Sequence, residues 1–154
     1  MRSTMKVYEL SIKYSLVEEG PVETLSNASK VVEYMRNAFD ELPLGETFYV
    51  ILLNRKNRPM GRHKVTTGTA TAALCHPREV FRIAVLGTAC SLIAVHNHPS
   101  GISEPSAADL SITKLLVEAG RCLEIPVLDH IIIGNPIDDP TGKGYFSWRE
   151  SGLM

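Results

Sequence analysis

The sequence predicts an α/β domain in which helices flank a mixed β-sheet. Three apolar runs of strand length, residues 47–53, 91–95 and 127–134, are separated by stretches with helical periodicity. Strands buried on both faces are nearly continuous apolar runs, and their alternation with helices is typical of layered α/β domains. With 154 residues, of which 44% are hydrophobic, the chain has the size of one domain that needs no disulfides.

Before the first of these runs, the sequence predicts an edge strand and a helix. Residues 7–17 have a mixed period-2 pattern, which favours an edge strand. Asn27 can cap a helix over residues 28–39, whose apolar side chains recur at helical spacing. That helix is expected to stop before Pro43.

The middle of the chain predicts a buried strand, a hairpin and a short helix. Residues 47–53, TFYVILL, are rich in aromatic and β-branched side chains and predict a central strand. The turn residues of 54–61 predict a hairpin into a second strand. Pro77 suits the first turn of a helix over residues 77–89, and Gly87 weakens its last turn.

The strongest helix of the chain is predicted over residues 106–123. Buried strands precede and follow it at residues 91–95 and 127–134, and residues 144–148 predict a short closing strand. The apolar face of the helix is expected to contain Ile112, Leu116, Ala119 and Leu123. Projection of the helical period back by one turn places Asp109 on this inward face.

Composition limits the expected partners and compartment. The formal net charge of −1 gives no overall electrostatic argument for nucleic acid or for an acidic membrane surface. The start of the chain lacks the apolar core of a secretory signal, and no run approaches the roughly 18 apolar residues of a membrane span. The three cysteines, Cys75, Cys90 and Cys122, fit no zinc-finger spacing and are each expected to be small core residues. We therefore expect a reduced, cytoplasmic protein without a membrane partner.

His96, His98 and Asp109 form the strongest candidate site. Residues two apart on a strand point to the same face, so both imidazoles can aim at one point while Asn97 faces away. The following helix can bring Asp109 to the same point. A carboxylate aimed at the core is costly unless a cation or hydrogen bonds compensate for it. Three such ligands leave one tetrahedral position free, which is typical of a catalytic zinc site.

Each part of this site also has a structural interpretation. Ser106 followed by Asp109 is an ordinary capping pattern at the start of a helix. An isolated H-x-H in a strand is more often structural than metal-binding. The conjunction of both patterns at the end of an apolar strand favours the metal site.

The segment HNHPSGISEPSAAD, residues 96–109, resembles the JAMM signature of JAB/MPN metalloproteases. In that signature, H-x-H is followed after seven residues by S-x-x-D. The wider context is similar to the bacterial RadC-type branch of the family, through GT at 68–69, HPREVF at 76–81 and LDHIIIG at 128–134. The resemblance covers residues 25–150 as the core of the domain, and residues 1–24 are then an N-terminal edge-strand extension.

The resemblance implies one domain over residues 1–154, with a cytidine-deaminase-like architecture and no helix-hairpin-helix region. It implies that His96, His98 and Asp109 bind one Zn²⁺ and that water fills the fourth position. Glu46 matches the glutamate that transfers the proton, and Ser106 would hydrogen-bond the developing oxyanion. Glu79 is the competing glutamate, although a helix-capping or structural role is favoured for it.

Two further features have more than one interpretation. His130 and Asp129 could form hydrogen bonds behind the zinc ligands, and a buried structural role is at least as well supported. The basic run at residues 55–64 could contact phosphates or an acidic protein tail, but a solvated hairpin is the simpler interpretation.

The favoured function is therefore a zinc-dependent peptidase or isopeptidase that acts on an unknown peptide or protein. An alternative from another class is a non-catalytic module in DNA repair, recombination or mobile-element biology, which the name of the RadC branch suggests. Nucleic acid as a partner has no support from the overall charge. A non-haem iron oxygenase, which also uses two histidines and a carboxylate, fits the ligand order less well. The pattern does not define the oligomeric state.

Overall fold

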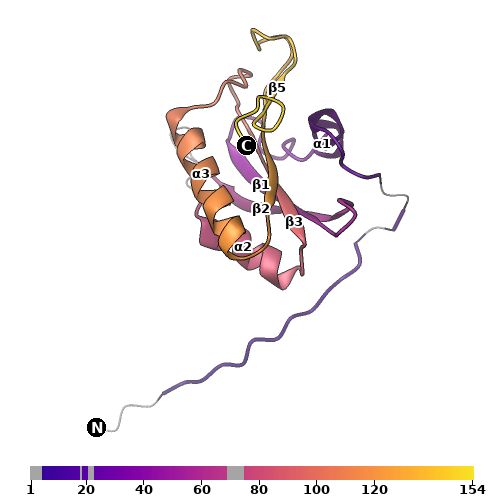
Figure 1. Ribbon diagram of the computed structural model, residues 1–154, viewed down its shortest axis with the longest axis vertical. Coiled ribbons are helices and arrows are strands. Elements are labelled where there is room, and N and C mark those ends of the chain that lie inside the picture. Colours follow the sequence, from indigo (N-terminus) through magenta and orange to yellow (C-terminus); the bar gives the residue numbers. More distant parts are fainter. Residues whose placement is uncertain (1–4, 18, 21–22, 69–74) are drawn as a thin grey trace.

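A mixed five-stranded sheet forms the centre of the computed structural model, which describes residues 5–17, 19–20, 23–68 and 75–154 (Figure 1). The strand order is β2-β1-β3-β4-β5. β3 and β4 run parallel, and the other neighbouring pairs are antiparallel. The strands are β1 (Thr47–Leu53), β2 (Pro59–Thr67), β3 (Ser91–Asn97), β4 (Val127–Ile133) and β5 (Tyr145–Ser147). The predicted α/β class and the mixed sheet are confirmed.

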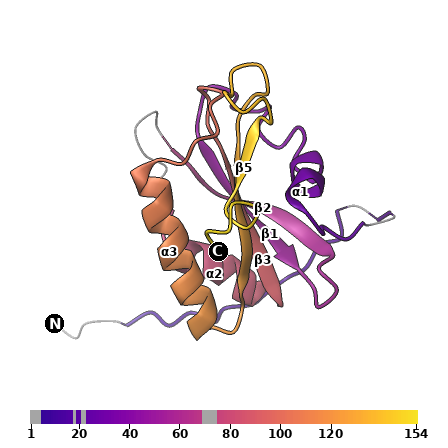
Figure 2. The same ribbon diagram turned by 45° about the horizontal axis from the view of Figure 1, so that its top comes forward.

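Helices cover both faces of the sheet. They are α1 (Ala28–Tyr34), α2 (Pro77–Leu86) and α3 (Ala107–Cys122). Figure 2 shows α1 on one side of the sheet and α2 and α3 on the other. One apolar cluster lies between the sheet and α2 and α3, and a second lies between the sheet and α1. Because β1 and β3 lie between the two clusters, all seven residues of each are buried.

The connection from β3 through α3 to β4 determines where the candidate site lies. β3 ends at Asn97, and α3 begins ten residues later at Ala107. The chain therefore turns back at one edge of the sheet. On the same edge, the start of β1 lies beside the end of β3, since Phe48 pairs with His96. The ends of three elements thus meet at one place.

The first helix is shorter than the sequence predicts. It ends at Tyr34 rather than at residue 39. Asn37 has a φ of 68°, which a helix cannot contain, and the guanidinium of Arg62 donates to the Tyr34 carbonyl at 2.7 Å. Met35 and Ala38 are still buried, although they lie in turns after the helix. The apolar spacing therefore predicts burial here, but not helical structure.

The predicted edge strand over residues 7–17 is wrong. The segment pairs with no strand in the part of the chain that the structure describes, and its large apolar side chains are exposed. Figure 1 shows it leading away from the domain. A period-2 pattern describes how a strand is buried, but it supplies no partner for the backbone groups. The hydroxyl of Tyr14 does donate to the Leu86 carbonyl at 2.8 Å.

The inward face of α3 differs from the prediction by part of a turn. Its buried residues are Asp109, Thr113, Leu116 and Gly120. Asp109 therefore points inward as expected, whereas Leu123 is 48% exposed at the end of the helix. A Cβ at Gly120 would lie 2.6 Å from the Ile125 carbonyl oxygen, so close packing requires glycine there. Hydrophobicity alone misses a face that contains threonine and glycine.

The remaining elements lie close to their predicted ranges. The hairpin joins β1 to β2, and Pro77 begins α2, which ends before Gly87. Cys75 is buried, but the expectation of core positions for Cys90 and Cys122 is wrong, because they lie exposed at element ends. Thr69 of the GT pair lies outside the described residues. Within those residues, no helix combines the length and apolarity that crossing a membrane requires.

We predict that deletion of residues 1–17 changes the free energy of unfolding by less than about 1 kcal/mol, because residues 5–17 bury no side chain against the domain. Met35→Ala, which empties a site that is 1% exposed, is expected to cost about 2–5 kcal/mol. Urea unfolding of both variants and the full chain measures this. A truncation that costs as much as Met35→Ala would contradict the exposed placement.

Candidate metal centre

Four side chains from three parts of the fold meet at this edge of the sheet. Glu46 precedes β1, His96 lies in β3, His98 follows it, and Asp109 lies in the first turn of α3. One ligand atom from each lies within 4.8 Å of all the others. His96 Nε2 lies 3.1 Å from both His98 Nε2 and Asp109 Oδ1, and 3.9 Å from Glu46 Oε1. Two imidazoles and carboxylates at these separations can hold one metal ion.

The alternation of side chains along β3 separates the two imidazoles from Asn97, as the sequence predicts. The Asn97 carboxamide accepts a hydrogen bond from Thr47 N at 2.8 Å and donates one to the Gly45 carbonyl at 3.0 Å. These two peptide groups flank Glu46. Asn97 therefore fixes the backbone that presents Glu46 to the cluster, a contact that the sequence did not reveal.

A backbone carbonyl orients His98. Its Nδ1 lies 2.9 Å from the Ile102 carbonyl oxygen. A carbonyl can only accept, so Nδ1 carries the proton and Nε2 presents its lone pair to the cluster. The loop turns tightly enough for this contact because Gly101 has a φ of 82°, a conformation that favours glycine. The Gly101 carbonyl in turn accepts from Asn135 N at 2.7 Å.

Asp109 serves as a helix cap and as a member of the cluster. Its Oδ2 accepts from the Ser106 hydroxyl at 2.6 Å and from Ser106 N at 2.7 Å, and the hydroxyl accepts from Asp109 N at 3.2 Å. This is a complete capping box. Its Oδ1 faces His96 instead. Oδ2 also lies 3.4 Å from His98 Nε2. The capping and metal interpretations are nevertheless compatible, because Oδ1 makes none of the capping bonds.

The electrostatics of the cluster favour a charged carboxylate. Burial raises the pKa of Asp109, but hydrogen bonds from His96 and His98 in their protonated forms and from Ser106, with the imidazole charge, hold that pKa well below its usual range. Burial lowers the pKa of His98, but the bonds to Asp109 and Ile102 and the nearby carboxylates outweigh it and raise the net pKa. The ionised Asp109 carboxylate therefore favours a positively charged group at the cluster.

His130 and Asp129, which are neighbours in β4, make hydrogen bonds in two different parts of the structure. His130 is fully buried behind the cluster, with Nε2 2.9 Å from His96 Nδ1, and its burial holds its pKa well below the usual value. Asp129 instead accepts from the Ser147 hydroxyl at 2.6 Å and from Arg149 N at 3.1 Å. It holds β5 and the residues that follow it, and it contacts none of the four cluster side chains.

Thr113 is a residue that sequence reasoning missed. Its hydroxyl lies 2.6 Å from His130 Nδ1 and donates to the Asp109 carbonyl at 2.6 Å. The signal that could have found it is its place one turn after Asp109 on the inward face of the helix. A polar side chain at such a position needs a partner.

The other candidates lie away from the cluster. Glu79, in the first turn of α2, pairs with Arg82 at 2.7 Å. The basic run of 55–64 forms an exposed hairpin, in which Arg62 binds the end of α1 and Lys64 pairs with Glu41 at 3.0 Å. The ion pair agrees with a structural role for Glu79 in α2, and the hairpin contacts agree with the solvated hairpin.

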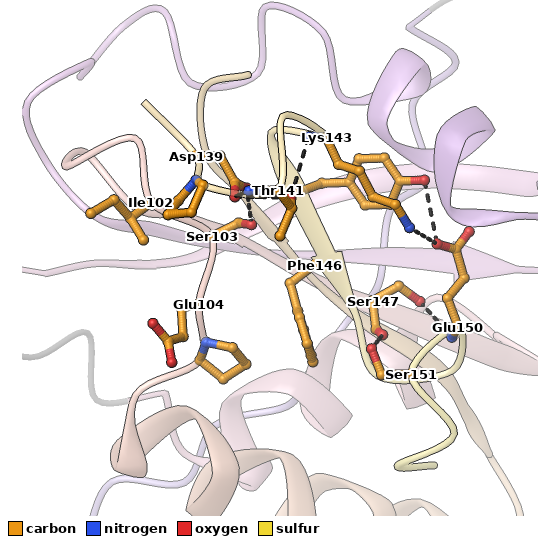
Figure 3. Close-up of a pocket in the computed structure, with 13 residues that line it drawn as sticks. Ile102, Ser103, Glu104, Asp139, Thr141, Lys143, Phe146, Ser147, Glu150 and Ser151 are labelled. Carbon is orange, nitrogen blue, oxygen red and sulfur yellow. Dashed lines mark hydrogen bonds and ion pairs between the residues drawn. The ribbon is translucent and has the colours of Figure 1, made fainter. Parts of the chain in front are cut away.

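A cavity of about 420 Å³ lies beside the loop that joins His98 to α3. Figure 3 shows Ile102, Ser103 and Glu104 on one side of it and Ser147, Glu150 and Ser151 on the other. None of the four cluster side chains lines it. The loop between His98 and α3 therefore separates the cavity from the cluster. The candidate site is the cluster, because the titratable side chains are concentrated there and not in the cavity.

Comparisons with known proteins agree with the geometry. A family model described as the RadC-like JAB domain matches residues 25–153. A UPF0758 protein from Thermosynechococcus vestitus is 56% identical over 90 residues, which cover 58% of this chain and 36% of the relative. A UPF0758 protein from Chlorobaculum parvum is 42% identical over 130 residues, or 84% of this chain and 55% of the relative. One from Symbiobacterium thermophilum is 45% identical over 130 residues, or 84% and 52%. The chain spans about half the length of the last two relatives.

We predict that the affinity of the protein for added Zn²⁺ falls as the pH is lowered. His98 must lose its proton to act as a ligand, and its pKa lies above the ordinary 6.5, so protons begin to compete above that pH. Well below the pKa, the affinity should fall by about tenfold per pH unit for each competing proton. Chelator competition between about pH 5.5 and 8 measures this, with the chelator's own protonation taken into account. A flat profile would exclude His98 from the binding site.

Proposed function

Because the chain belongs to the RadC-like JAB domain family, we propose that it is a zinc-dependent metallohydrolase that cleaves an amide bond, as a peptidase or an isopeptidase. The observation that carries this proposal is the convergence of Glu46, His96, His98 and Asp109. Two histidines and one carboxylate are a sufficient zinc ligand set, and they leave a coordination position open. The fourth side chain is then free for proton transfer.

His96 Nε2, His98 Nε2 and Asp109 Oδ1 would hold the ion. When bound, Zn²⁺ lowers the pKa of a water molecule toward 7 and polarises a substrate carbonyl. Glu46 takes a proton from the attacking water and returns it to the leaving amine. Its side chain is 23% exposed and its Oε1 is 3.9 Å from His96 Nε2, so it is close to the ion site and open to water.

Ser106 would stabilise the oxyanion that develops on the substrate. Its hydroxyl donates to Asp109 Oδ2 in the structure, so this role requires the hydroxyl to turn toward the substrate. The backbone N of Ser106 would keep Oδ2 in place during that turn. A donor of this kind is worth roughly 3 kcal/mol of transition-state stabilisation where it has been measured.

The substrate in this proposal is a peptide or protein in the cytoplasm. The absence of disulfides among Cys75, Cys90 and Cys122 supports this location. A non-catalytic module for DNA repair, recombination or mobile-element biology is less well supported, because two basic side chains of the hairpin are already engaged within the domain.

We expect elemental analysis of the protein purified without added metal to find about one zinc per chain. Asp109→Asn should lower zinc affinity by about 100-fold or more, because it removes the anionic ligand. Glu118→Gln is the matched control, since it removes an exposed carboxylate from the same helix. A folded wild type that binds no zinc after reconstitution would overturn the proposal, and a site occupied by iron would redirect it to oxygenase chemistry.

Glu46→Gln is expected to retain zinc and to lose about 10²–10⁴-fold in hydrolysis of an internally quenched peptide library. Glu79→Gln is the control, because Glu79 is the competing glutamate and pairs with Arg82 away from the cluster. Loss of activity in Glu79→Gln alone would reassign the proton transfer. Failure of the zinc-loaded wild type to hydrolyse any peptide or isopeptide would contradict the peptidase assignment.

A further inference from the structure

A hydrogen-bonded chain links the backbone of Asp109 to the ring of His96. It runs from the Asp109 carbonyl to the Thr113 hydroxyl, to His130, and then to His96 Nδ1. We propose that Thr113 and His130 are positioning residues that fix His96 in the tautomer with a free Nε2, the atom that faces the cluster. This inference rests on the proposed metal site, and it concerns how these hydrogen bonds prepare His96 to bind the ion.

The direction of the chain is set by the single proton of the Thr113 hydroxyl. Thr113 Oγ1 and the Asp109 carbonyl oxygen are 2.6 Å apart, and only the hydroxyl can supply a proton between them. The hydroxyl therefore has only its lone pairs to offer His130 Nδ1, which also lies at 2.6 Å. It follows that His130 carries its proton on Nδ1.

His130 passes this constraint to His96. The His130 ring is 0% exposed, and such burial favours the neutral form. A neutral ring with a proton on Nδ1 has a lone pair on Nε2. His130 Nε2 is 2.9 Å from His96 Nδ1, so the proton between them belongs to His96. In the neutral His96 ring, which is the form that binds a metal, Nε2 is then unprotonated and available as a ligand.

The reverse arrangement is disfavoured at Thr113 and is incompatible with metal binding at His96. If Thr113 donated to His130, its oxygen and the Asp109 carbonyl oxygen would face each other at 2.6 Å without a proton. A neutral His96 would then carry its proton on Nε2, the atom that faces the cluster, and could not bind a metal there. Aromatic packing also limits rotation of the His130 ring, because Trp148 stacks on it with centroids 4.5 Å apart and an interplanar angle of 10°.

The two imidazoles of the cluster are thus oriented by different means. The Ile102 carbonyl fixes His98 directly, whereas His96 depends on two intermediate side chains. Asp109 contributes to both ends of the arrangement, since its carboxylate faces His96 Nε2 and its carbonyl begins the chain. A shift of the first turn of α3 would therefore move the ligand and its support together.

Thr113→Val tests this inference, because it keeps the shape of the side chain and removes the hydroxyl. We expect Zn²⁺ affinity, measured by chelator competition, to fall by about 10- to 100-fold. Thr113→Ser should restore it, since serine retains the donor. Ser111→Ala is the control, because Ser111 makes the same bond, to the Ala107 carbonyl, on the exposed side of α3. Wild-type affinity in Thr113→Val would overturn the proposal.

A second measurement needs neither metal nor activity. Long-range ¹H–¹⁵N NMR spectra of the metal-free wild type report which nitrogen of His130 is protonated. We expect Nδ1–H in the wild type and a mixture of tautomers in Thr113→Val. A wild-type His130 protonated on Nε2 overturns the inference even if the protein binds zinc. The expected tautomer in a protein that binds no zinc would instead contradict the proposed function and leave the hydrogen-bonded chain standing.

Discussion

The burial of the Asp109 carboxylate is the constraint on which the rest of the centre depends. An ionised carboxylate in an apolar core is costly unless charge and hydrogen bonds compensate for it. Here the compensation comes from the capping box of α3, from the positive end of the helix dipole and from two imidazoles. All of these partners must lie within one turn of the start of α3. The path of the chain from β3 into α3 therefore has to bring the helix start back over the strand end.

In the proposed function, different segments of the chain hold the ion and move the proton. His96, His98 and Asp109 belong to β3, its extension and α3, which are joined by one continuous stretch of chain. Glu46 comes from a different segment, and Asn97 ties that segment to β3 through the peptide groups on either side of Glu46. A change in one part can therefore alter proton transfer without altering the ligands.

Much of the fold can be predicted from the sequence because the patterns that predict it are local. TFYVILL is buried along its whole length, and the S-x-x-D pattern forms the cap that its spacing predicts. The sequence also selected the four side chains that the structure brings together. What it could not supply is tertiary. The carbonyl at the end of α1 accepts from Arg62 of a distant hairpin, and the apolar alternation of residues 7–17 has no strand beside it among the described residues. Thr113 is equally hidden, because its partner His130 lies 17 positions away.

The alternation of His96, Asn97 and His98 makes assembly of the centre an all-or-none matter. A slip of β3 by one position against β1 would turn both imidazoles toward α1 and place the carboxamide among the carboxylates. Six paired positions between these strands oppose such a slip, and the amide of His98 adds a bond to the Ile133 carbonyl at 2.9 Å. Misfolded chains would thus lose both ligands at once rather than one. This topology therefore does not readily form a population that keeps only one of the two imidazoles at the cluster and binds a metal weakly.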